Sequence, residues 1–291
     1  MPSFLKPDGP APTLAEALRT ASRRLETASP SALLDAEILL AHVLGKSRTY
    51  LRAWPEASLE PEPQALFDAL IERRVNGAPI AYLTGSREFW SRDFIVTPAV
   101  LIPRPETELL VEMALAHLRE HPTAAVLDLA TGSGAIAVTL ATEYRTATVS
   151  ASDISAPALA VARRNAARWG AAVRFLESDW FANLPAGLEF DLIVSNPPYI
   201  PDTDPHLREG DLRFEPPIAL QGGPDGMAAY RTIAEQACAR LRPNGVLLLE
   251  HGFDQAHAVG ALLKQHRYRH IDHHADLQGH WRATCATAPE R

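Results

Sequence analysis

Residues 128–137 read Asp-Leu-Ala-Thr-Gly-Ser-Gly-Ala-Ile-Ala, and this stretch decides the fold class. The apolar residues at 126–129 predict a buried strand, and residues 135–144 have helical spacing. The glycines of such a turn allow a close backbone approach to a ligand, and the helix N-terminus offers unpaired N–H groups. The stretch therefore predicts a ligand site between a strand and a helix of an α/β fold.

The same alternation continues along the chain. Further strands are predicted at 147–152, 173–177, 191–194 and 245–250, and further helices at 157–169, 227–241 and 255–266. This order predicts a parallel sheet covered by helices on both faces. Residues 267–285 look like strands again, and we expect them to add an antiparallel edge to the sheet.

The N-terminal part has a different pattern. From 13 to 77 apolar residues recur at helical spacing, and Gly45 is placed to end the second of three expected helices. Aromatic and β-branched residues around Ser91-Arg92-Asp93 predict a short hairpin or an extended linker. The predicted organisation is a helical domain at 1–84, a β-hairpin linker at 85–104 and an α/β domain at 105–291.

Composition excludes several classes of protein. Of 291 residues, 46% are hydrophobic and 22% charged, which is typical of a globular protein and not of a disordered or collagen-like chain. The net charge of −7 argues against bulk electrostatic binding of nucleic acid, although a local basic groove stays possible. The Arg23-Arg24 and Arg73-Arg74 pairs are expected on solvated helix faces, or alternatively against an acidic partner protein.

The cellular setting is predicted from absences. There are two cysteines, Cys238 and Cys285, with no CxxC spacing, which favours a reduced compartment. The proline-rich start at 1–12 has no signal-peptide pattern, and no apolar run approaches the roughly 20 residues that span a bilayer. We expect a soluble, cytoplasmic protein, monomeric by default because no heptad pattern is visible.

An acidic residue follows the second predicted strand of the α/β part. In such sheets ligands bind beyond the carboxyl ends of the strands, where Asp153 can accept hydrogen bonds from both ribose hydroxyls or simply cap the next helix. The loop Gly132-x-Gly134-x-x-Ala137 also fits a dinucleotide fingerprint. Asp128 at the mouth of the loop would repel a pyrophosphate but hold an ammonium group. A nucleoside with a cationic amino-acid tail fits better, which points to S-adenosylmethionine.

Ser195-Asn196-Pro197-Pro198-Tyr199 follows the strand predicted at 191–194. The two prolines stiffen this turn and donate no N–H, so it presents the Asn196 side-chain oxygen and a backbone carbonyl as acceptors. Two acceptors can hold both hydrogens of a planar NH₂ group, with Tyr199 against its flat face. An amide nitrogen is a poor nucleophile because its lone pair is delocalised. Holding its hydrogens out of plane turns that lone pair toward an incoming methyl group.

Together these segments resemble the class I S-adenosylmethionine-dependent methyltransferases that modify planar amino groups. More closely, the chain is similar to the protein-(glutamine-N5) methyltransferases of peptide chain release factors, the HemK/PrmC family. The similarity covers most of the chain, and the order and spacing of its segments are specific. The matching segments are 101–108, 128–137, 153–155, 178–181, 191–200, 215–220, 222–226, 248–252 and 276–280.

The resemblance implies a class I (Rossmann-like) methyltransferase sheet with a small all-helical N-terminal domain that docks the protein substrate. It implies S-adenosyl-L-methionine as cofactor, with Asp153 at the ribose and Trp180 beside the adenine. It implies that the turn from Asn196 to Tyr199 clamps the glutamine of a Gly-Gly-Gln loop in a release factor. The implied cofactor-binding residues are Ala130, Thr131, Gly132, Ser133, Gly134, Asp153, Trp180 and Asn196; the implied substrate-binding residues are Asn196, Pro197, Pro198 and Tyr199, of which Asn196, Pro197 and Tyr199 are catalytic.

Some positions have less certain roles. Arg104, Glu106 and Glu108 would line the same cleft. Ala130 stands where the family usually has glycine, which is tolerable if its φ angle is negative. Asn244 replaces a glycine in a turn and should not matter.

Two other functions are kept as alternatives. A nucleic-acid methyltransferase acting on adenine N6 or guanine N2 would use the same Asn-Pro-Pro-Tyr chemistry on a flipped base, but the acidic balance speaks against phosphate contacts. A non-enzymatic binding module is disfavoured by the intact turn at Asn196.

The histidines near the C-terminus are expected to be solvated strand residues and not a metal site, because alternate side chains of a strand point to opposite faces. His251, beside Glu250, forms either an acid/base pair or a support for the cleft, and the second is favoured. No metal is expected. The C-terminal histidines are His266, His270, His273, His274 and His280.

Overall fold

The computed structural model describes residues 11–289, and the chain divides into two compact units at Gly85/Ser86. The start of the chain up to position 10, where no signal peptide was expected, lies outside the described residues. The hairpin predicted as a linker belongs to the second unit. Among residues 11–289, none of the helices has both the length and the apolar character that crossing a membrane requires.

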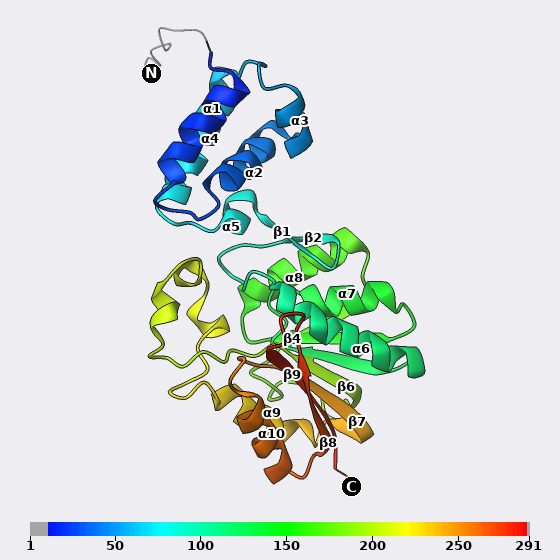
Figure 1. The fold of residues 1–291 in the computed structure, drawn as a ribbon. Coiled ribbons are helices and arrows are strands. Elements are labelled where there is room, and N and C mark those ends of the chain that lie inside the picture. The colour runs from blue at the N-terminus through cyan, green and yellow to red at the C-terminus, as the bar shows by residue number, and fades with distance from the viewer. Residues whose placement is uncertain (1–10, 290–291) are drawn as a thin grey trace. The chain divides into compact units, whose positions relative to one another are not determined.

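The first unit is helical, as predicted, and is drawn from blue to cyan in Figure 1. Its first helix begins with a capping box, in which the Thr13 hydroxyl accepts from the backbone N–H of Glu16 and the Glu16 carboxylate accepts from that of Thr13. Its second helix ends at Gly45, whose φ of 60° is left-handed. The helices are α1 (Leu14–Leu25), α2 (Ala32–Leu44), α3 (Arg48–Ala53), α4 (Pro61–Val75) and α5 (Ile80–Thr84).

Two buried acids of α2 hold this unit together through ion pairs. Asp35 accepts from Arg74 Nε at 2.7 Å, and Glu37 is paired with both Arg48 and Arg52. Arg74 is only 11% exposed, so its prediction on a solvated face was wrong. Arg74 is buried because its partner Asp35 is buried, and a buried carboxylate is costly unless a cation accompanies it.

The second unit contains the predicted α/β sheet. Among the described residues, seven strands lie in the order β5-β4-β3-β6-β7-β9-β8, with the first five parallel and the last two antiparallel. The antiparallel edge predicted near the C-terminus is thereby confirmed. The strands are β3 (Ala125–Leu129), β4 (Thr148–Asp153), β5 (Val173–Glu177), β6 (Phe190–Ser195), β7 (Leu241–Glu250), β8 (Arg269–Ala275) and β9 (Trp281–Thr287).

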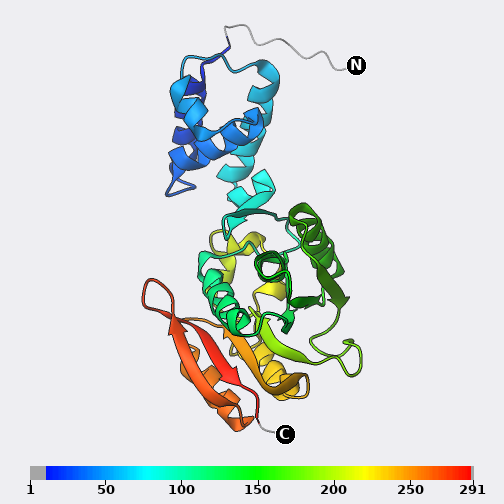
Figure 2. The same cartoon turned by 90° about the vertical axis from the view of Figure 1, so that its right-hand side faces the viewer.

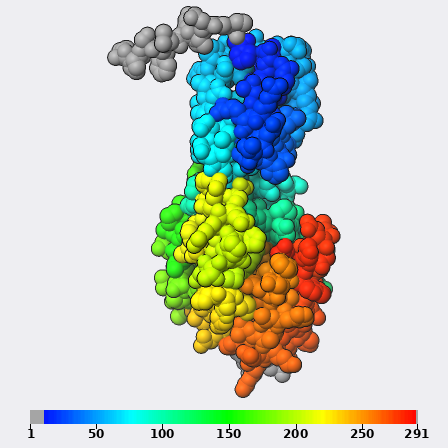
Figure 3. Space-filling view, turned by 60° about the vertical axis from the view of Figure 1, so that its left-hand side comes forward, coloured from blue at the N-terminus to red at the C-terminus, as the bar shows by residue number. Residues whose placement is uncertain are grey.

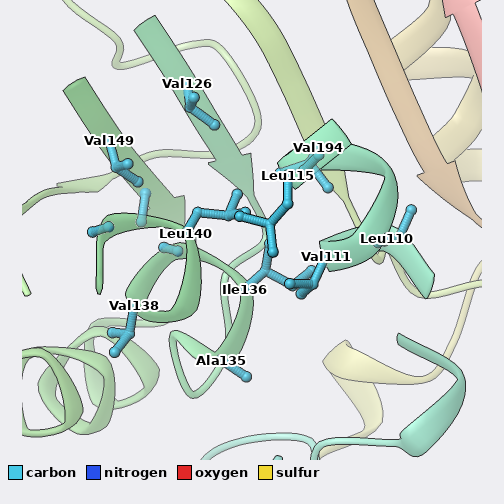
Figure 4. Packing of buried hydrophobic residues seen from close by; sticks show 14 of the residues in the cluster. Leu110, Val111, Leu115, Val126, Ala135, Ile136, Val138, Leu140, Val149 and Val194 are labelled. Atoms are coloured by element: carbon cyan, nitrogen blue, oxygen red, sulfur yellow. The ribbon is translucent and has the colours of Figure 1, made fainter. Parts of the chain in front are cut away.

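Helices cover both faces of the sheet (Figures 1 and 2). One core cluster joins α6, α7 and α8 to the sheet, and Figure 4 shows Leu115 and Leu140 packing beside Val126 and Val194 there. A second cluster joins α9 and α10 to the opposite face. Full burial of one leucine or valine side chain stabilises the folded state by about 1.5–3 kcal/mol. The helices are α6 (Glu108–Glu120), α7 (Ala135–Glu143), α8 (Ala156–Trp169), α9 (Ala228–Ala237) and α10 (Ala256–Gln265), with 3₁₀ turns η1 (Pro105–Thr107), η2 (Pro205–Arg208), η3 (Leu212–Phe214) and η4 (Pro217–Ala219).

One predicted helix is too long. The helix expected at 227–241 ends at Ala237, and Leu241 already begins β7 opposite Phe190. The β6–β7 pairing shifts register between Phe190 and Leu192, and Asn244 adopts a left-handed φ of 62° within the strand. This irregular pairing lets a Pro-Asn-Gly sequence, normally a turn signal, lie inside a strand.

One buried side chain holds the end of the hairpin formed by β1 (Ser86–Phe89) and β2 (Arg92–Ile95) against the rest of the second unit. Asn165 of α8 is fully buried, accepts from the Ile95 N–H at 2.7 Å and donates to the Ile95 carbonyl at 3.0 Å. Its amide also donates to the carbonyl of Ser133 at 2.8 Å. The end of the hairpin and the glycine loop therefore share one buried amide.

Candidate active site

A cavity of about 630 Å³ opens at the carboxyl ends of β3, β4, β5 and β6. Its position is the one predicted for a ligand in this type of sheet. Residues from the segments 99–104 and 216–223 and from the start of α9 also line it. The predicted site residues that line it are Ala130, Thr131, Gly132, Ser133, Asp153, Trp180, Asn196 and Pro198.

The glycine loop between β3 and α7 contains three left-handed residues. Position 134 requires glycine, because its φ is 80° and a Cβ there would lie 3.0 Å from the Ala162 Cβ. Gly132 has a φ of 56°, and a Cβ would meet nothing within 4 Å. Ala130 has a φ of 61°, so the negative φ under which an alanine would be tolerable there is not adopted. The loop imposes a glycine-like backbone on an alanine, at a cost of about 1 kcal/mol.

Asp128 was expected at the mouth of this loop. It lies inside the loop instead and holds it by hydrogen bonds. Its side chain is buried, and Oδ2 accepts from the Thr131 hydroxyl at 2.6 Å and the Ala137 N–H at 3.1 Å. In the part of the chain that the structure describes, Oδ1 has no hydrogen-bond partner. Burial raises the pKa of Asp128 to about 7.

Asp153, at the end of β4, joins the loop to the next helix. Its Oδ2 accepts from the Gly132 N–H and its Oδ1 from the Ser155 N–H, both at 2.9 Å. Burial raises the pKa of this carboxyl, opposed by these hydrogen bonds. A carboxylate has about four lone-pair sites, so two stay available for hydroxyl groups of a ligand. The two roles weighed from the sequence, ligand binding and helix capping, are thus compatible.

Two apolar side chains line the cavity near Asp153. Trp180 was predicted from the resemblance, whereas Ile154 was missed. Ile154 is 49% exposed, which is unusual for a large apolar side chain. Its position directly after the strand-end aspartate is the sequence signal that could have identified it.

The Asn-Pro-Pro-Tyr turn reaches the cavity from β6. Ser195 anchors it by donating from its hydroxyl to the Leu129 carbonyl at 2.6 Å, and Asn196 donates from Nδ2 to Thr107 Oγ1 at 3.1 Å. This hydrogen bond leaves Asn196 Oδ1 as an acceptor. Pro197 is buried, and Tyr199 is half-buried against the second core cluster, where burial raises its pKa.

The loop at 220–226 and Gln255, which precedes α10, support the end of this turn. The Ile200 N–H donates to the Leu220 carbonyl at 2.9 Å, and Gln255 donates from Nε2 to the Tyr199 carbonyl at 3.0 Å. Gly226 lies so close that a Cβ there would clash with Tyr199 O. Figure 3 shows this loop region in yellow at the surface, next to the orange part of the chain that carries Gln255. Gln255 was not predicted as a site residue, because its contact with Tyr199 spans 56 positions of the sequence.

The three residues expected to line the cleft from 104 to 108 differ in placement. Arg104 lines the cavity and forms an ion pair with the buried Glu215, whose Oε2 also accepts from the Ile102 N–H at 2.9 Å. Glu108 does not line it: its carboxylate accepts from the Trp90 N–H at 2.7 Å and ties the hairpin turn to α6. Glu106 is half-buried and lies outside the cavity lining.

His251 supports the strands and does not pair with Glu250. It is fully buried, with Nε2 hydrogen-bonded to the Thr284 hydroxyl and Nδ1 to the Gly252 carbonyl, both at 2.9 Å. Burial lowers its pKa. Across residues 11–289, no three His, Cys, Asp or Glu side chains are arranged to hold a metal ion.

Known proteins with this fold define the class. A methyltransferase from Pyrococcus furiosus matches with a TM-score of 0.52 at 19% identity, covering 75% of this chain and 97% of that chain. The T. thermophilus 16S rRNA N2 G1207 methyltransferase, solved with AdoMet and guanosine, matches with a TM-score of 0.50 at 21% identity, covering 70% of this chain and 49% of that chain. The second unit therefore has the fold of the class I S-adenosylmethionine-dependent methyltransferases.

Sequence similarity shows the family. Residues 16–85 match the PrmC N-terminal domain, and residues 106–208 match the methyltransferase small domain. A release factor glutamine methyltransferase of Burkholderia pseudomallei is 53% identical over 268 residues, covering 90% of this chain and 94% of the relative. The chain belongs to the family of release factor glutamine methyltransferases.

Proposed function

We propose that this protein transfers the methyl group of S-adenosyl-L-methionine to the side-chain nitrogen (N5) of the glutamine in the Gly-Gly-Gln loop of a peptide chain release factor. The observation that carries the proposal is Asn196: its Nδ2 is engaged by Thr107, and its Oδ1 stays an acceptor at a cavity that also contains the glycine loop and Asp153. The name of the B. pseudomallei relative supports the same substrate.

The residues of the cavity fit S-adenosylmethionine. Asp153 has lone pairs available for ribose hydroxyls, and Trp180 and Ile154 supply apolar surface for the adenine. The open space at Gly132 allows the tail of the cofactor to approach the loop backbone. When bound, the cofactor supplies a methyl group on a positively charged sulfur, which makes that methyl group electrophilic.

The Asn196 turn prepares the substrate nitrogen for this methyl group. Asn196 Oδ1 and a backbone carbonyl of the turn accept the two N–H hydrogens and hold the nitrogen lone pair toward the cofactor side. In this transfer the bound cofactor would supply the methyl group and keep the electron pair of its S–C bond, while the residues of the chain hold the accepting nitrogen. The methylated nitrogen is then a strong acid, so it releases its proton to water and needs no dedicated base.

The helical unit is proposed to dock the protein substrate. Leu33 and Leu34 at the start of α2 are 54% and 39% exposed, which provides apolar surface for a partner. Replacing both by serine should raise the KM for the release factor and leave kcat unchanged. Equal KM values for the variant and the parent would refute this role.

The test of the function is methyl transfer from labelled S-adenosylmethionine to a purified release factor. The matched control is the same factor with the glutamine of its Gly-Gly-Gln loop replaced. Label is expected only on the intact factor and should be lost with Asn196→Ala. Label on rRNA, tRNA or DNA instead would refute the glutamine proposal and favour a nucleic-acid amino methyltransferase.

A further inference from the structure

A buried carboxyl lies beside the Asn196 amide and has no part in the mechanism above. Glu250, the last residue of β7, is only 2% exposed. The register of β7 on β6 pairs Leu249 with Ser195, so Glu250 follows directly beside Asn196. Burial raises the pKa of this carboxyl, and hydrogen bonding with Thr107 and with Asn196 opposes that rise. Its Oε2 is buried without a hydrogen-bond partner among residues 11–289. Such a carboxyl costs stability, so its position beside the site calls for a role.

The three side chains form a directed series of donors. Asn196 donates from Nδ2 to Thr107 Oγ1 at 3.1 Å, so this oxygen acts as acceptor and its own proton is available to the carboxyl of Glu250. An ionised carboxyl only accepts hydrogen bonds. It therefore keeps the Thr107 hydroxyl and the Asn196 NH₂ group turned toward itself.

We propose that Glu250, through Thr107, is a positioning residue that orients the Asn196 amide with Oδ1, and not Nδ2, toward the substrate. The inference rests on the proposed function, because only a substrate with N–H groups needs an acceptor there. With the amide reversed, the NH₂ group of Asn196 would face the NH₂ group of the glutamine. Two donors cannot hydrogen-bond each other, so the substrate nitrogen would no longer be held.

The charge on Glu250 is what fixes the direction. Burial, the largest effect, raises its pKa to about 7; Arg282 of β9 opposes this and Glu106 adds to it. The phenols of Tyr199 and Tyr230 also interact with this carboxyl, and burial raises the pKa of both. Tyr230 donates to the Glu250 backbone carbonyl at 2.9 Å. Below the pKa the carboxyl can itself donate, and the direction is lost.

The kinetic test uses near-isosteric variants. Glu250→Gln keeps the shape but adds a donor, so kcat on the release factor should fall about tenfold or more while the KM for S-adenosylmethionine stays within about twofold. Thr107→Val should give the same pattern, and Thr107→Ser, which keeps the hydroxyl, should restore most of kcat. The kcat of the parent should rise with pH through about 7, and this rise should be absent in Glu250→Gln.

A second measurement does not depend on the substrate. In the intact chain, NMR should show the Asn196 side-chain NH₂ protons exchanging with water more slowly in the parent than in Glu250→Gln or Thr107→Val. Equal exchange rates would overturn the inference even if the parent protein methylates no release factor, which by itself would refute only the proposed function. If the parent is active, unchanged kcat in Glu250→Gln and Thr107→Val overturns it. If Glu250→Gln does not fold, the Thr107→Val and Thr107→Ser pair decides alone.

Discussion

Gly226 offers a sharp test of how the catalytic turn is held. Its φ is 71°, and an added Cβ would lie 2.8 Å from Gln255 Nε2 and closer still to the Tyr199 carbonyl oxygen. Ordinary contact begins near 3.4 Å, so the Gly226→Ala variant must displace that carbonyl by about 1 Å, a shift that can cost about 100-fold in rate. The left-handed backbone costs about 1 kcal/mol more.

The matched control is Gly187→Ala, because Gly187 has a φ of 73° and open space around the added Cβ. Both variants should lower the melting temperature by about 2–4 °C per kcal/mol lost, but only Gly226→Ala should lose about 100-fold in kcat for release-factor methylation. Affinity for S-adenosylmethionine, measured by calorimetry, should change less than about twofold in both variants, since neither glycine lines the cavity. Equal kcat values for the two variants would refute the reasoning.

Three further predictions concern the cofactor loop. Ala130→Gly should raise the free energy of unfolding by up to about 1 kcal/mol, because strain at the positive φ exceeds the added entropy of the unfolded chain; thermal unfolding that shows a decrease would contradict the left-handed backbone. Asp153→Asn should weaken S-adenosylmethionine binding by about 10- to 100-fold in calorimetry, because bonds to a charged acceptor contribute about 1.5–3 kcal/mol; unchanged affinity would remove Asp153 from the ribose site. The pKa of Asp128 is raised from 3.8 to about 7, so its contribution to stability is complete below pH 3.8 and is lost as pH rises through 7. Denaturant titrations at a series of pH values should show this loss in the parent and not in Asp128→Asn. The same dependence of stability on pH in both proteins would contradict the prediction.

The sequence predicts the second unit well because its signals are local. Alternating strands and helices, the glycines after β3 and the prolines after β6 each report on their own segment, and the parallel sheet with an antiparallel edge follows from them. The helix at 227–241 was overextended because the pairing of Leu241 with Phe190 depends on a strand 51 positions away.

The candidate site was predicted only in part, for the same reason. Asn196 was identified from its own turn, but its partner Thr107 lies 89 positions away and its neighbour Glu250 comes from another strand. The positive φ of Ala130 does not follow from the residue type, because the closure of the loop dictates it. Asp128 was expected at the mouth of the loop because the sequence does not show which side of a turn is buried.

The shared amide of Asn165 makes the hairpin and the cofactor loop thermodynamically interdependent. Because this one side chain binds both Ile95 and the carbonyl of Ser133, opening the hairpin end takes away two of the three hydrogen bonds that orient the amide toward the loop. Linkage requires the effect to be equal in both directions. The free energy by which bound cofactor stabilises the closed hairpin therefore equals the free energy by which the closed hairpin strengthens cofactor binding. A partner that pulls on residues 86–95 would thus also lower the affinity for the cofactor.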